Sequence, residues 1–572
     1  MKHTIIDGIG PFFRRHPEGR INWSKIPFAA LQRAGGLCPD IRRELPEDFD
    51  RFCRRAAAWG FNTITLDDLA HLYLSPHYPA PLRSLLMDYA GLYHELVAIA
   101  RRHGLAVWFT TDIMFYPRDE AQKLERPPLK RAIAELEKAL HYVFERYPDI
   151  GGIIFRIGES DAHDVTGDFL SRLVIRSPRQ GRHLVERLLP VFERYQRLLI
   201  FRTWSVGAFS VGDLLWNRDT YDRLFRDIRS PNLLVSIKYG ESDFFRYLPL
   251  NPRFSRSGQR KIIELQARRE YEGFGEFPSF IGSDYQAYRD AIKELPEVVG
   301  MSVWGQTGGW SHYRRLTLLQ PEAVWNDINV WTCIRLFRDG VTVEGAVRSY
   351  FQQHAMTGRW DRLLEMLECS ERVIKTLLYT DDFANRRIYF RRLRVPPLLA
   401  VYWDHIFING ALRKIHRCFV FDGEAKIRQA REAIHDLRRM GELAREVGLS
   451  GSDIVFMTDT LTLLALARVY YFRDVESAAL QELEAAVTRY RETHGKRAYQ
   501  VHVDTRPWRI SRRRLKRLFA ILLRERRGYR RFDRLFVLRG LALVYSVVRV
   551  FHRRLVPEFA RQQAMGIDTI FK

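Results

Sequence analysis

Four short β-rich runs follow one another between residues 198 and 303, separated by stretches with helical periodicity. They read LLIFRT at 198–203, LLVSIK at 233–238, IIELQ at 262–266 and VVGMSV at 298–303. Each run is mostly apolar, which is typical of a strand buried on both faces of a parallel sheet. The intervals leave room for one crossover helix between successive strands. This part of the chain therefore predicts repeated βα units.

The same alternation extends toward the N-terminus. Four earlier runs complete a set of eight strands: Ile21–Phe28, Asn62–Leu66, Ala106–Thr110 and Gly152–Ile157. Amphipathic helical stretches separate the runs, among them Pro46–Trp59, Leu86–His103, Pro128–Tyr147 and His183–Tyr195. Eight strands alternating with helices over about 300 residues predict a (β/α)8 TIM barrel in residues 1–320. The alternative, a doubly wound open sheet, usually carries a Gly-rich phosphate loop, and neither GxGxxG nor GxxxxGK[ST] is present.

After residue 320 the pattern becomes helical, which predicts an all-α C-terminal domain after the barrel. We expect a helical domain at 321–500, packed on the barrel, and an Arg-rich helical segment at 501–572. The expected helices are Pro321–Gln353, Trp360–Tyr379, Pro396–His416, Glu424–Val447, Ser452–Tyr471, Val475–His494, Arg506–Arg531 and Arg534–His552. A short extended segment is expected within Tyr499–Trp508.

The net charge of +24 is unevenly distributed. Between Thr505 and Arg554 there are 17 Lys and Arg but two acidic residues, a net +15, so the rest of the chain carries +9. A basic chain suggests a nucleic-acid partner, but concentration of the charge in one segment argues against it for the whole protein. The basic segment is amphipathic. It is either a solvated face packed on the helical domain, which we favour, or a contact with an anionic surface.

Other bulk features point to a cytoplasmic protein. The five cysteines are widely spaced and form no CxxC motif, so neither a disulfide framework nor a zinc site is expected. Residues 1–13 lack the basic start and apolar run of a signal peptide. The apolar stretch Leu535–Phe551 is interrupted by two arginines, so we expect a helix and no membrane span.

Polar and aromatic side chains follow the predicted strands. In a barrel these positions share the face that carries active sites. Carboxylates can act as acid, base and hydroxyl acceptors, and flat aromatic rings stack on sugar C–H surfaces, so the set predicts a carbohydrate site. The alternative for any one carboxylate is a solvated helix N-cap, and for any one tryptophan it is core packing. The set comprises Asp67, Asp68, Asp112, Glu159, Asp161, Glu241, Asp243, Glu270, Trp204, Trp304 and Trp310, with Tyr271 as a further candidate sugar platform.

Three basic residues lie near the ends of the fourth, fifth and sixth predicted strands: Arg156, Arg202 and Lys238. An inward cation in a barrel needs an anionic partner, because an unpaired buried charge is costly. That partner is either a carboxylate of the protein or an acidic group of the substrate. The two interpretations are compatible, and both place these cations at the functional rim.

Three sequence blocks resemble the α-glucuronidases of glycoside hydrolase family 67. SIKYGESDF at 236–244 is similar to the family's K-N-G-P-x-D-F segment, and ELQARREYEG at 264–273 to its E-x-Q-x-x-Q-E-Y-x-G segment. WSH at 310–312 resembles its N-W-T-G-H loop. A fourth block, GGIIFRIGESD at 151–161, is similar to the segment around the family's acid, with the glutamate one position earlier. The resemblance covers residues 20 to 355.

The resemblance implies an inverting hydrolase that releases a terminal uronic acid from an oligosaccharide without a metal or cofactor. It places the general acid at Glu159, with Asp161 as the substitute that the one-residue offset allows, and the base at Asp243 or Glu270. In inverting enzymes the acid and base carboxyls lie about 6.5–9.5 Å apart. Lys238 matches the family's lysine, and Arg156 and Arg202 stand where basic residues would pair with the uronate. Trp310 is the best supported of the sugar platforms.

Two departures from the family bear on the substrate. The family usually has an α/β domain before the barrel, whereas the first predicted strand comes almost at the start of this sequence, and the helices after residue 380 do not resemble the family's C-terminal domain. The alternatives are therefore a hydrolase of the same type acting on another sugar, and a non-catalytic carbohydrate-binding barrel. The expected partner is a glycoside, acidic in the leading interpretation, and the sequence leaves a homo-oligomer open.

Overall fold

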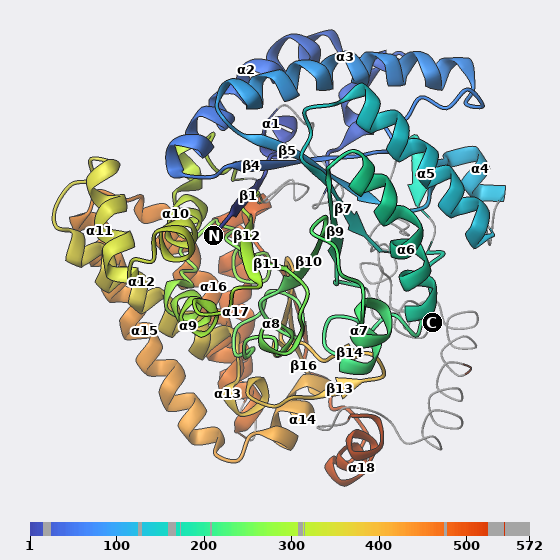
Figure 1. The fold of residues 1–572 in the computed structure, drawn as a ribbon. Coiled ribbons are helices and arrows are strands. Elements are labelled where there is room, and N and C mark those ends of the chain that lie inside the picture. Colours follow the sequence, from blue (N-terminus) through green and yellow to red (C-terminus); the bar gives the residue numbers. More distant parts are fainter. Residues whose placement is uncertain are drawn as a thin grey trace.

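The computed structural model describes residues 1–14, 25–123, 128–157, 167–171, 173–205, 209–306, 313, 315–473, 477–523 and 543. Eight parallel strands form a closed barrel (Figure 1). They are β1 (His3–Asp7), β4 (Thr63–Asp67), β5 (Ala106–Asp112), β7 (Gly152–Arg156), β9 (Leu198–Arg202), β10 (Leu233–Lys238), β11 (Lys261–Gln266) and β12 (Val298–Trp304). Each barrel strand pairs with the next along the chain, and β12 closes onto β1. The predicted (β/α)8 barrel is confirmed.

The first strand differs from the sequence prediction. It is β1, at His3–Asp7, which pairs with β12 on one side and β4 on the other. The predicted run Ile21–Phe28 is wrong: residues 25–27 carry no strand and Phe28 begins the 3-10 helix η1 (Phe28–Leu31). Only two adjacent isoleucines mark β1 as apolar, and they are fully buried. Such a short apolar signal is easily passed over beside a longer run.

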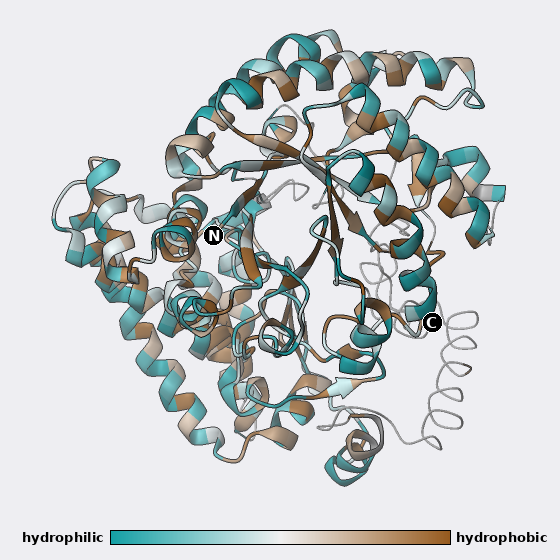
Figure 2. Cartoon of the chain, viewed as in Figure 1, coloured by the Kyte–Doolittle hydropathy of each residue, from teal (hydrophilic) through white to brown (hydrophobic). Residues whose placement is uncertain are grey.

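Helices surround the barrel in the alternating order that the sequence predicts. The main ones are α2 (Pro39–Trp59), α3 (Ala80–Arg102), α5 (Leu129–Arg146), α6 (Pro178–Arg194), α7 (Arg218–Phe225) and α9 (Gly282–Ile292). A capping box starts α6: the Ser177 hydroxyl accepts the Gln180 N–H, and the Gln180 side chain accepts the Ser177 N–H. Figure 2 shows apolar strands at the centre and polar residues on the outer helix faces. Burial of the inner helix faces against the strands forms the core.

A small antiparallel ribbon projects beyond the carboxyl ends of two barrel strands. It joins β6 (Phe115–Pro117), which follows β5, to β8 (Phe169–Ser171), which follows β7. The short helix α4 (Arg118–Lys123) continues directly from β6. The ribbon therefore ties together two loops on the rim where barrel enzymes carry their sites.

The chain after residue 320 is mainly helical, as predicted. Its longer helices are α10 (Val324–Asp339), α11 (Val343–Gln353), α12 (Trp360–Val373), α14 (Gly410–Phe419), α15 (Gly423–Glu446), α16 (Gly451–Phe472), α17 (Ser477–His494) and α18 (Arg512–Leu522). A π-helical turn, η3 (Ile374–Leu378), follows α12. The single helix expected at Pro321–Gln353 is divided at Gly340, which adopts φ +72° after α10.

The expected helix at Pro396–His416 is wrong over most of its length. The chain instead forms β15 (Val401–Tyr402) and β16 (His405–Asn409) before α14 begins. The predicted extended segment near residue 500 is β17 (Gln500–Asp504), which pairs in parallel with β16. A hairpin of β13 (Tyr389–Phe390) and β14 (Leu393–Arg394) was also missed. Pairing with a strand about 95 residues away in sequence supplies the backbone partners that β16 needs, which no local pattern reveals.

One helix in the described part of the chain is long and apolar enough to cross a membrane. This is α16, whose most apolar 18-residue window has a mean hydropathy of 1.3. Two thirds of that window is buried inside the protein, where α16 packs against α14, α15 and α17. Its composition is therefore accounted for by a core helix of the C-terminal region.

Candidate active site

The strand ends place most of the predicted site residues on one rim of the barrel. Asp67, Asp112, Arg156, Arg202, Lys238 and Trp304 are the last residues of β4, β5, β7, β9, β10 and β12. Trp204, Asp243, Glu270 and Tyr271 lie in the loops that follow β9, β10 and β11. Glu159, its substitute Asp161 and Trp310 lie outside the described residues.

Asp243 is held by a cation and a phenol. Its Oδ1 accepts hydrogen bonds from Lys238 Nζ at 2.5 Å and from the Phe244 N–H at 3.0 Å, and its Oδ2 accepts the Tyr271 hydroxyl at 2.7 Å. Burial alone would raise the pKa of Asp243, but the Lys238 charge and these hydrogen bonds bring it below its usual range. Asp243 is therefore a fixed carboxylate with both oxygens occupied.

Glu270 is held at one oxygen only. Its Oε2 accepts Arg268 Nη2 at 2.7 Å, and its backbone N–H donates to Gln266 Oε1 at 3.1 Å. Its Oε1 has no hydrogen-bond partner among the described residues, although the side chain is 2% exposed. Burial raises the pKa of Glu270, and although Arg268 opposes the rise, the nearby Asp243 charge adds to it. A buried oxygen without a hydrogen-bond partner costs free energy of folding. In native structures such an atom calls for an explanation, and a catalytic role is one.

The two carboxylates thus have opposite protonation tendencies on the same rim. The pKa of Asp243 is lowered and that of Glu270 is raised, and each is influenced by Lys238. Carboxyl pairs whose surroundings separate their pKa values are typical of acid–base sites. This pair is the strongest chemical feature among the described residues of the rim.

A second ion pair lies beside it, on β9 and β11. Arg202 Nε donates to both oxygens of Glu264 at 3.0 Å, and Ser236 Oγ donates to Glu264 Oε1 at 2.7 Å. The Arg202 guanidinium also lies 4.8 Å from the centroid of Trp304. Sequence reasoning missed Glu264, because a glutamate inside a strand gives no sign of facing the barrel interior. The signal that could have found it is the inward Arg202, which needs a buried anion.

Arg156, on β7, contacts the two predicted aspartates at the ends of the neighbouring strands β5 and β4. It is fully buried and donates to Asp67 Oδ1 at 3.2 Å and to Asp112 Oδ2 at 3.4 Å. Lys25 forms a further ion pair with Asp112, and the Ile26 N–H donates to Asp67 Oδ2 at 2.8 Å. Each of the three predicted cations is therefore paired with a carboxylate of the protein, the first of the two interpretations that the sequence left open.

Aromatic rings cover the cations of the rim. Trp204 has Lys238 Nζ 3.6 Å from its ring centroid, and Trp304 has Arg268 at 5.8 Å as well as Arg202. Tyr271 stacks on Trp403 at 6.3 Å with an interplanar angle of 16°. Trp403 comes from the turn between β15 and β16, about 130 residues further along the chain, and sequence analysis gave no reason to place it here. The C-terminal region therefore contributes a ring to the site.

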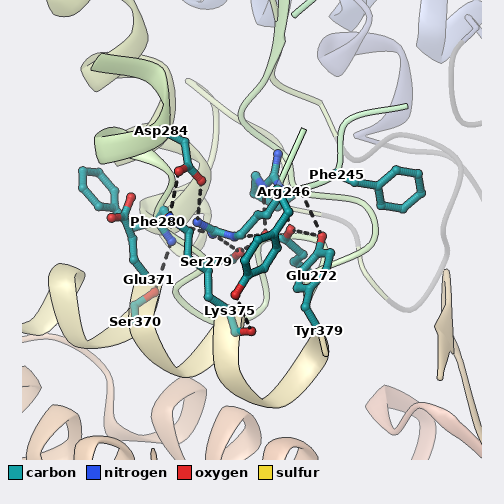
Figure 3. Close-up of polar contacts among 12 residues, drawn as sticks. Phe245, Arg246, Glu272, Ser279, Phe280, Asp284, Ser370, Glu371, Lys375 and Tyr379 are labelled. Atoms are coloured by element: carbon teal, nitrogen blue, oxygen red, sulfur yellow. Dashed lines mark hydrogen bonds and ion pairs between the residues drawn. The ribbon is translucent and has the colours of Figure 1, made fainter. Parts of the chain in front are cut away.

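Glu272 anchors the loop that carries Glu270 and Tyr271. It is fully buried and accepts hydrogen bonds from Arg246 Nε at 3.1 Å, Arg269 Nη2 at 2.6 Å, Ser279 Oγ at 2.7 Å and Tyr379 Oη at 2.6 Å. Although burial opposes it, the two guanidiniums lower the pKa of Glu272 to about 2. Figure 3 shows Arg246 at the centre of this cluster, with Tyr379 reaching in from the helical region.

The same cluster joins the barrel to the helical region. Arg246 Nη2 donates to the Phe280 carbonyl at 2.6 Å, and Lys375 of η3 donates to Asp284 of α9 at 2.7 Å (Figure 3). Ser370 of α12 accepts the Phe280 N–H at 3.1 Å. Hydrogen bonds from α12 and η3 thus hold the β11–α9 loop, so the helical region supports the loop on which Glu270 lies.

Comparisons with known proteins bear on the fold. No protein family model matches the chain, and no curated protein matches it in sequence. Its structure is similar to that of a GH138 enzyme targeting pectin rhamnogalacturonan II, with a TM-score of 0.51 and 11% identity over 86% of this chain and 61% of that one. The chain therefore spans less than two thirds of the length of that enzyme.

Two further solved structures were matched. One is CpGH84B, with a TM-score of 0.35 and 11% identity over 79% of this chain and 68% of that one. The other is an O-GlcNAc hydrolase mutant from Thermobaculum terrenum, with a TM-score of 0.38 and 12% identity over 79% of this chain and 88% of that one. At such identities the likeness to the GH138 enzyme is one of fold. The resemblance to family 67 stays a prediction.

Proposed function

We propose that this protein is a glycoside hydrolase in which Glu270 is the general base and Asp243 positions the residues around it. The observation that carries the proposal is the pair itself: a buried carboxyl with raised pKa and an unpartnered oxygen, beside a second carboxylate held ionised. Inverting glycoside hydrolysis requires a protonated acid and a separate ionised base, and carboxyls whose surroundings separate their pKa values are typical of such sites. The barrel fold shared with a GH138 enzyme is consistent with this chemistry.

In the proposed mechanism Glu270 is the general base. Its free Oε1 can accept a proton from water, and its raised pKa makes it a stronger base than an ordinary glutamate once it is ionised. Asp243 is a poor base because both of its oxygens are occupied and its pKa is lowered. Its role is to hold Lys238 and Tyr271. The acid proposed from the sequence is Glu159, which would protonate the leaving oxygen and give an inverting reaction.

The finer proposal is that the sugar released is a uronic acid. Lys238 lies against Trp204, and Arg202 against Trp304, so each cation is next to a flat ring suited to a sugar face. A uronate carboxylate would share Lys238 with Asp243. An arginine can bind a carboxylate through two parallel hydrogen bonds, which favours Arg202 as a second contact.

A panel of aryl glycosides tests both levels of the proposal. Glu270→Gln and Glu159→Gln should each lower kcat by about 10²–10⁴-fold on the best substrate, and Asp243→Asn should also lower it, because Lys238 and Tyr271 lose the carboxylate that holds them. The matched control is Glu365→Gln, because Glu365 also accepts hydrogen bonds from arginines but lies at the surface of α12. Unchanged turnover in Glu270→Gln would overturn the base assignment. Hydrolysis of glucosides in preference to glucuronides would overturn the uronate assignment.

The stereochemical outcome is measured separately. Proton NMR of the first-formed sugar anomer distinguishes inversion from retention. Release of the inverted anomer is expected, and the retained anomer would contradict the proposed roles. If the panel gives binding without turnover, the protein is a carbohydrate-binding barrel.

A further inference from the structure

A cavity of about 1010 Å³ is lined in part by residues of α4 and α5, and its lining residues include neither Glu270 nor Asp243. Its walls come from the segment between β4 and α3, from the β6–β8 ribbon and α4, and from the start of α5. Pockets that bind drug-sized ligands have volumes of about 300–1,000 Å³. The cavity is large enough for a short oligosaccharide, and the mechanism proposed above does not use it.

Tyrosine and phenylalanine rings form part of the wall. Tyr78 packs edge-on against Tyr73 with centroids 6.1 Å apart and tilts against Phe169 at 5.7 Å. Tyr116, on β6, is 8% exposed, and burial raises its pKa to about 12, so its hydroxyl is a neutral donor. Among the described residues, neither the Tyr78 nor the Tyr116 hydroxyl has a hydrogen-bond partner. Rings with unused hydroxyls suit a ligand that has both C–H faces and hydroxyl groups.

A carboxylate is built into the same wall. Asp168 Oδ2 accepts Gln32 Nε2 at 2.6 Å and lies 3.8 Å from His71 Nε2. His71 is buried, hydrogen-bonded to Asp68 at 2.7 Å and stacked on Phe28 with centroids 3.6 Å apart. Gln32 and His71 therefore fix the Asp168 side chain at the cavity. A fixed carboxylate is an acceptor for sugar hydroxyls.

The charges around the cavity define the ligand further. The acidic residues of the wall are Asp119, Glu120, Glu135 and Asp168, and the basic ones are Arg118, Lys123 and Arg131. Arg131 lies 3.8 Å from Glu120, and Arg118 Nε donates to the Gly167 carbonyl at 2.8 Å. Since the wall carries no excess of positive charge, a uronate or phosphate would gain little there and would meet the fixed Asp168.

We propose that this cavity binds a neutral oligosaccharide segment. Its rings would pack on sugar C–H faces, and the Tyr78, Tyr116 and Asp168 side chains would bond sugar hydroxyls. A lipid chain would leave these polar groups without partners. The choice of a carbohydrate ligand rests on the proposed function, but binding at this cavity can be measured without turnover.

Isothermal titration calorimetry on the full-length Glu270→Gln variant provides the test. The probes are the neutral tetrasaccharides maltotetraose, cellotetraose, xylotetraose and mannotetraose, with tetragalacturonate as the acidic comparison. Ala29 lines the cavity and is exposed, so Ala29→Trp should obstruct it with little effect on the core. The matched control is Ala30→Trp, on the same η1 turn but outside the cavity wall.

We expect at least one neutral tetrasaccharide to bind, and Ala29→Trp to weaken it at least tenfold while Ala30→Trp leaves it unchanged. Tyr78→Ala is the second variant and should weaken binding about tenfold, the effect of losing one ring contact. Circular dichroism melting verifies that the variants are folded. Three results would each overturn the proposal. They are the absence of binding by every neutral probe, an affinity that neither Ala29→Trp nor Tyr78→Ala changes, and tighter binding of tetragalacturonate than of any neutral probe.

The outcomes separate this inference from the proposed function. If aryl glycosides are hydrolysed but no neutral probe binds, the cavity assignment fails alone. If no glycoside is hydrolysed but binding is lost in Ala29→Trp, the hydrolase proposal fails and the cavity assignment holds.

Discussion

Glu272 provides the sharpest test of how the candidate site is held. Its carboxylate accepts hydrogen bonds from two buried guanidiniums, a serine and a tyrosine, and the residue is fully buried. Glu272→Gln removes the charge but keeps the shape. Arg246 and Arg269 would then be two buried cations without their shared anion. Breaking a buried pair in this way typically costs about 3–5 kcal/mol.

The lowered pKa of Glu272 gives the pH dependence of the same interaction. The pKa of Glu272 falls from 4.5 to about 2 in the folded protein, which corresponds to about 3 kcal/mol. Because the folded pKa is depressed, this contribution is fully present above pH 4.5 and is lost as the pH falls toward 2. The two magnitudes agree, so we expect Glu272→Gln to lower the free energy of unfolding by about 3 kcal/mol at pH 7.

Urea unfolding of wild type and Glu272→Gln at pH 7, 5, 4 and 3, followed by tryptophan fluorescence, measures both effects. The difference between the two proteins should be largest at pH 7 and 5 and should shrink below pH 4.5. Glu365→Gln is the control: Glu365 also accepts hydrogen bonds from arginines, but its side chain is 37% exposed and the loss should be at most ~1 kcal/mol. A Glu272→Gln effect no larger than that of Glu365→Gln, or one independent of pH, would refute the reasoning.

Two further predictions concern the loops of the rim. The Lys238 charge lowers the pKa of Glu270, so Lys238→Met should raise that pKa. The acidic limb of the kcat–pH profile should therefore move to higher pH. An unmoved limb would show that Glu270 is not the titrating base. Gly275→Ala should destabilise the protein by more than ~1 kcal/mol. Gly275 adopts φ +77°, and a Cβ there would lie 2.3 Å from Asn326 Oδ1 of α10. A melting temperature equal to that of wild type would contradict this prediction.

The barrel could be predicted from sequence because seven of its strands are buried on both faces and read as apolar runs at regular intervals. The first strand could not, since His3–Asp7 offers only two strongly apolar residues and depends on β12 and β4 for its partners. In the C-terminal region β16 was mistaken for part of a helix for the same reason. Its partner β17 is distant in sequence, and only the folded chain brings the two together.

The candidate site could be predicted in position but not in pairing. Barrel geometry puts strand-end residues on one rim, so strand spacing placed Lys238 and Glu270 there, while the resemblance to family 67 supplied their expected roles. Which carboxylate each cation meets depends on strand register, and this hid the Arg202–Glu264 pair. Glu270 and Glu272 stand two residues apart in the segment EYE, yet one has a free oxygen and the other is saturated. Local sequence cannot distinguish these two roles.

The Tyr379–Glu272 hydrogen bond and the Tyr271–Trp403 stack also order events during synthesis. When the barrel sequence has left the ribosome, the loop carrying Glu270 still lacks both of these supports. At ~5–20 residues per second the ring of Trp403 follows that loop on the order of ten seconds later. During this interval Arg246, Arg269 and Glu272 lack part of their final surroundings. The rim can reach its working form only after the helical region has begun to emerge.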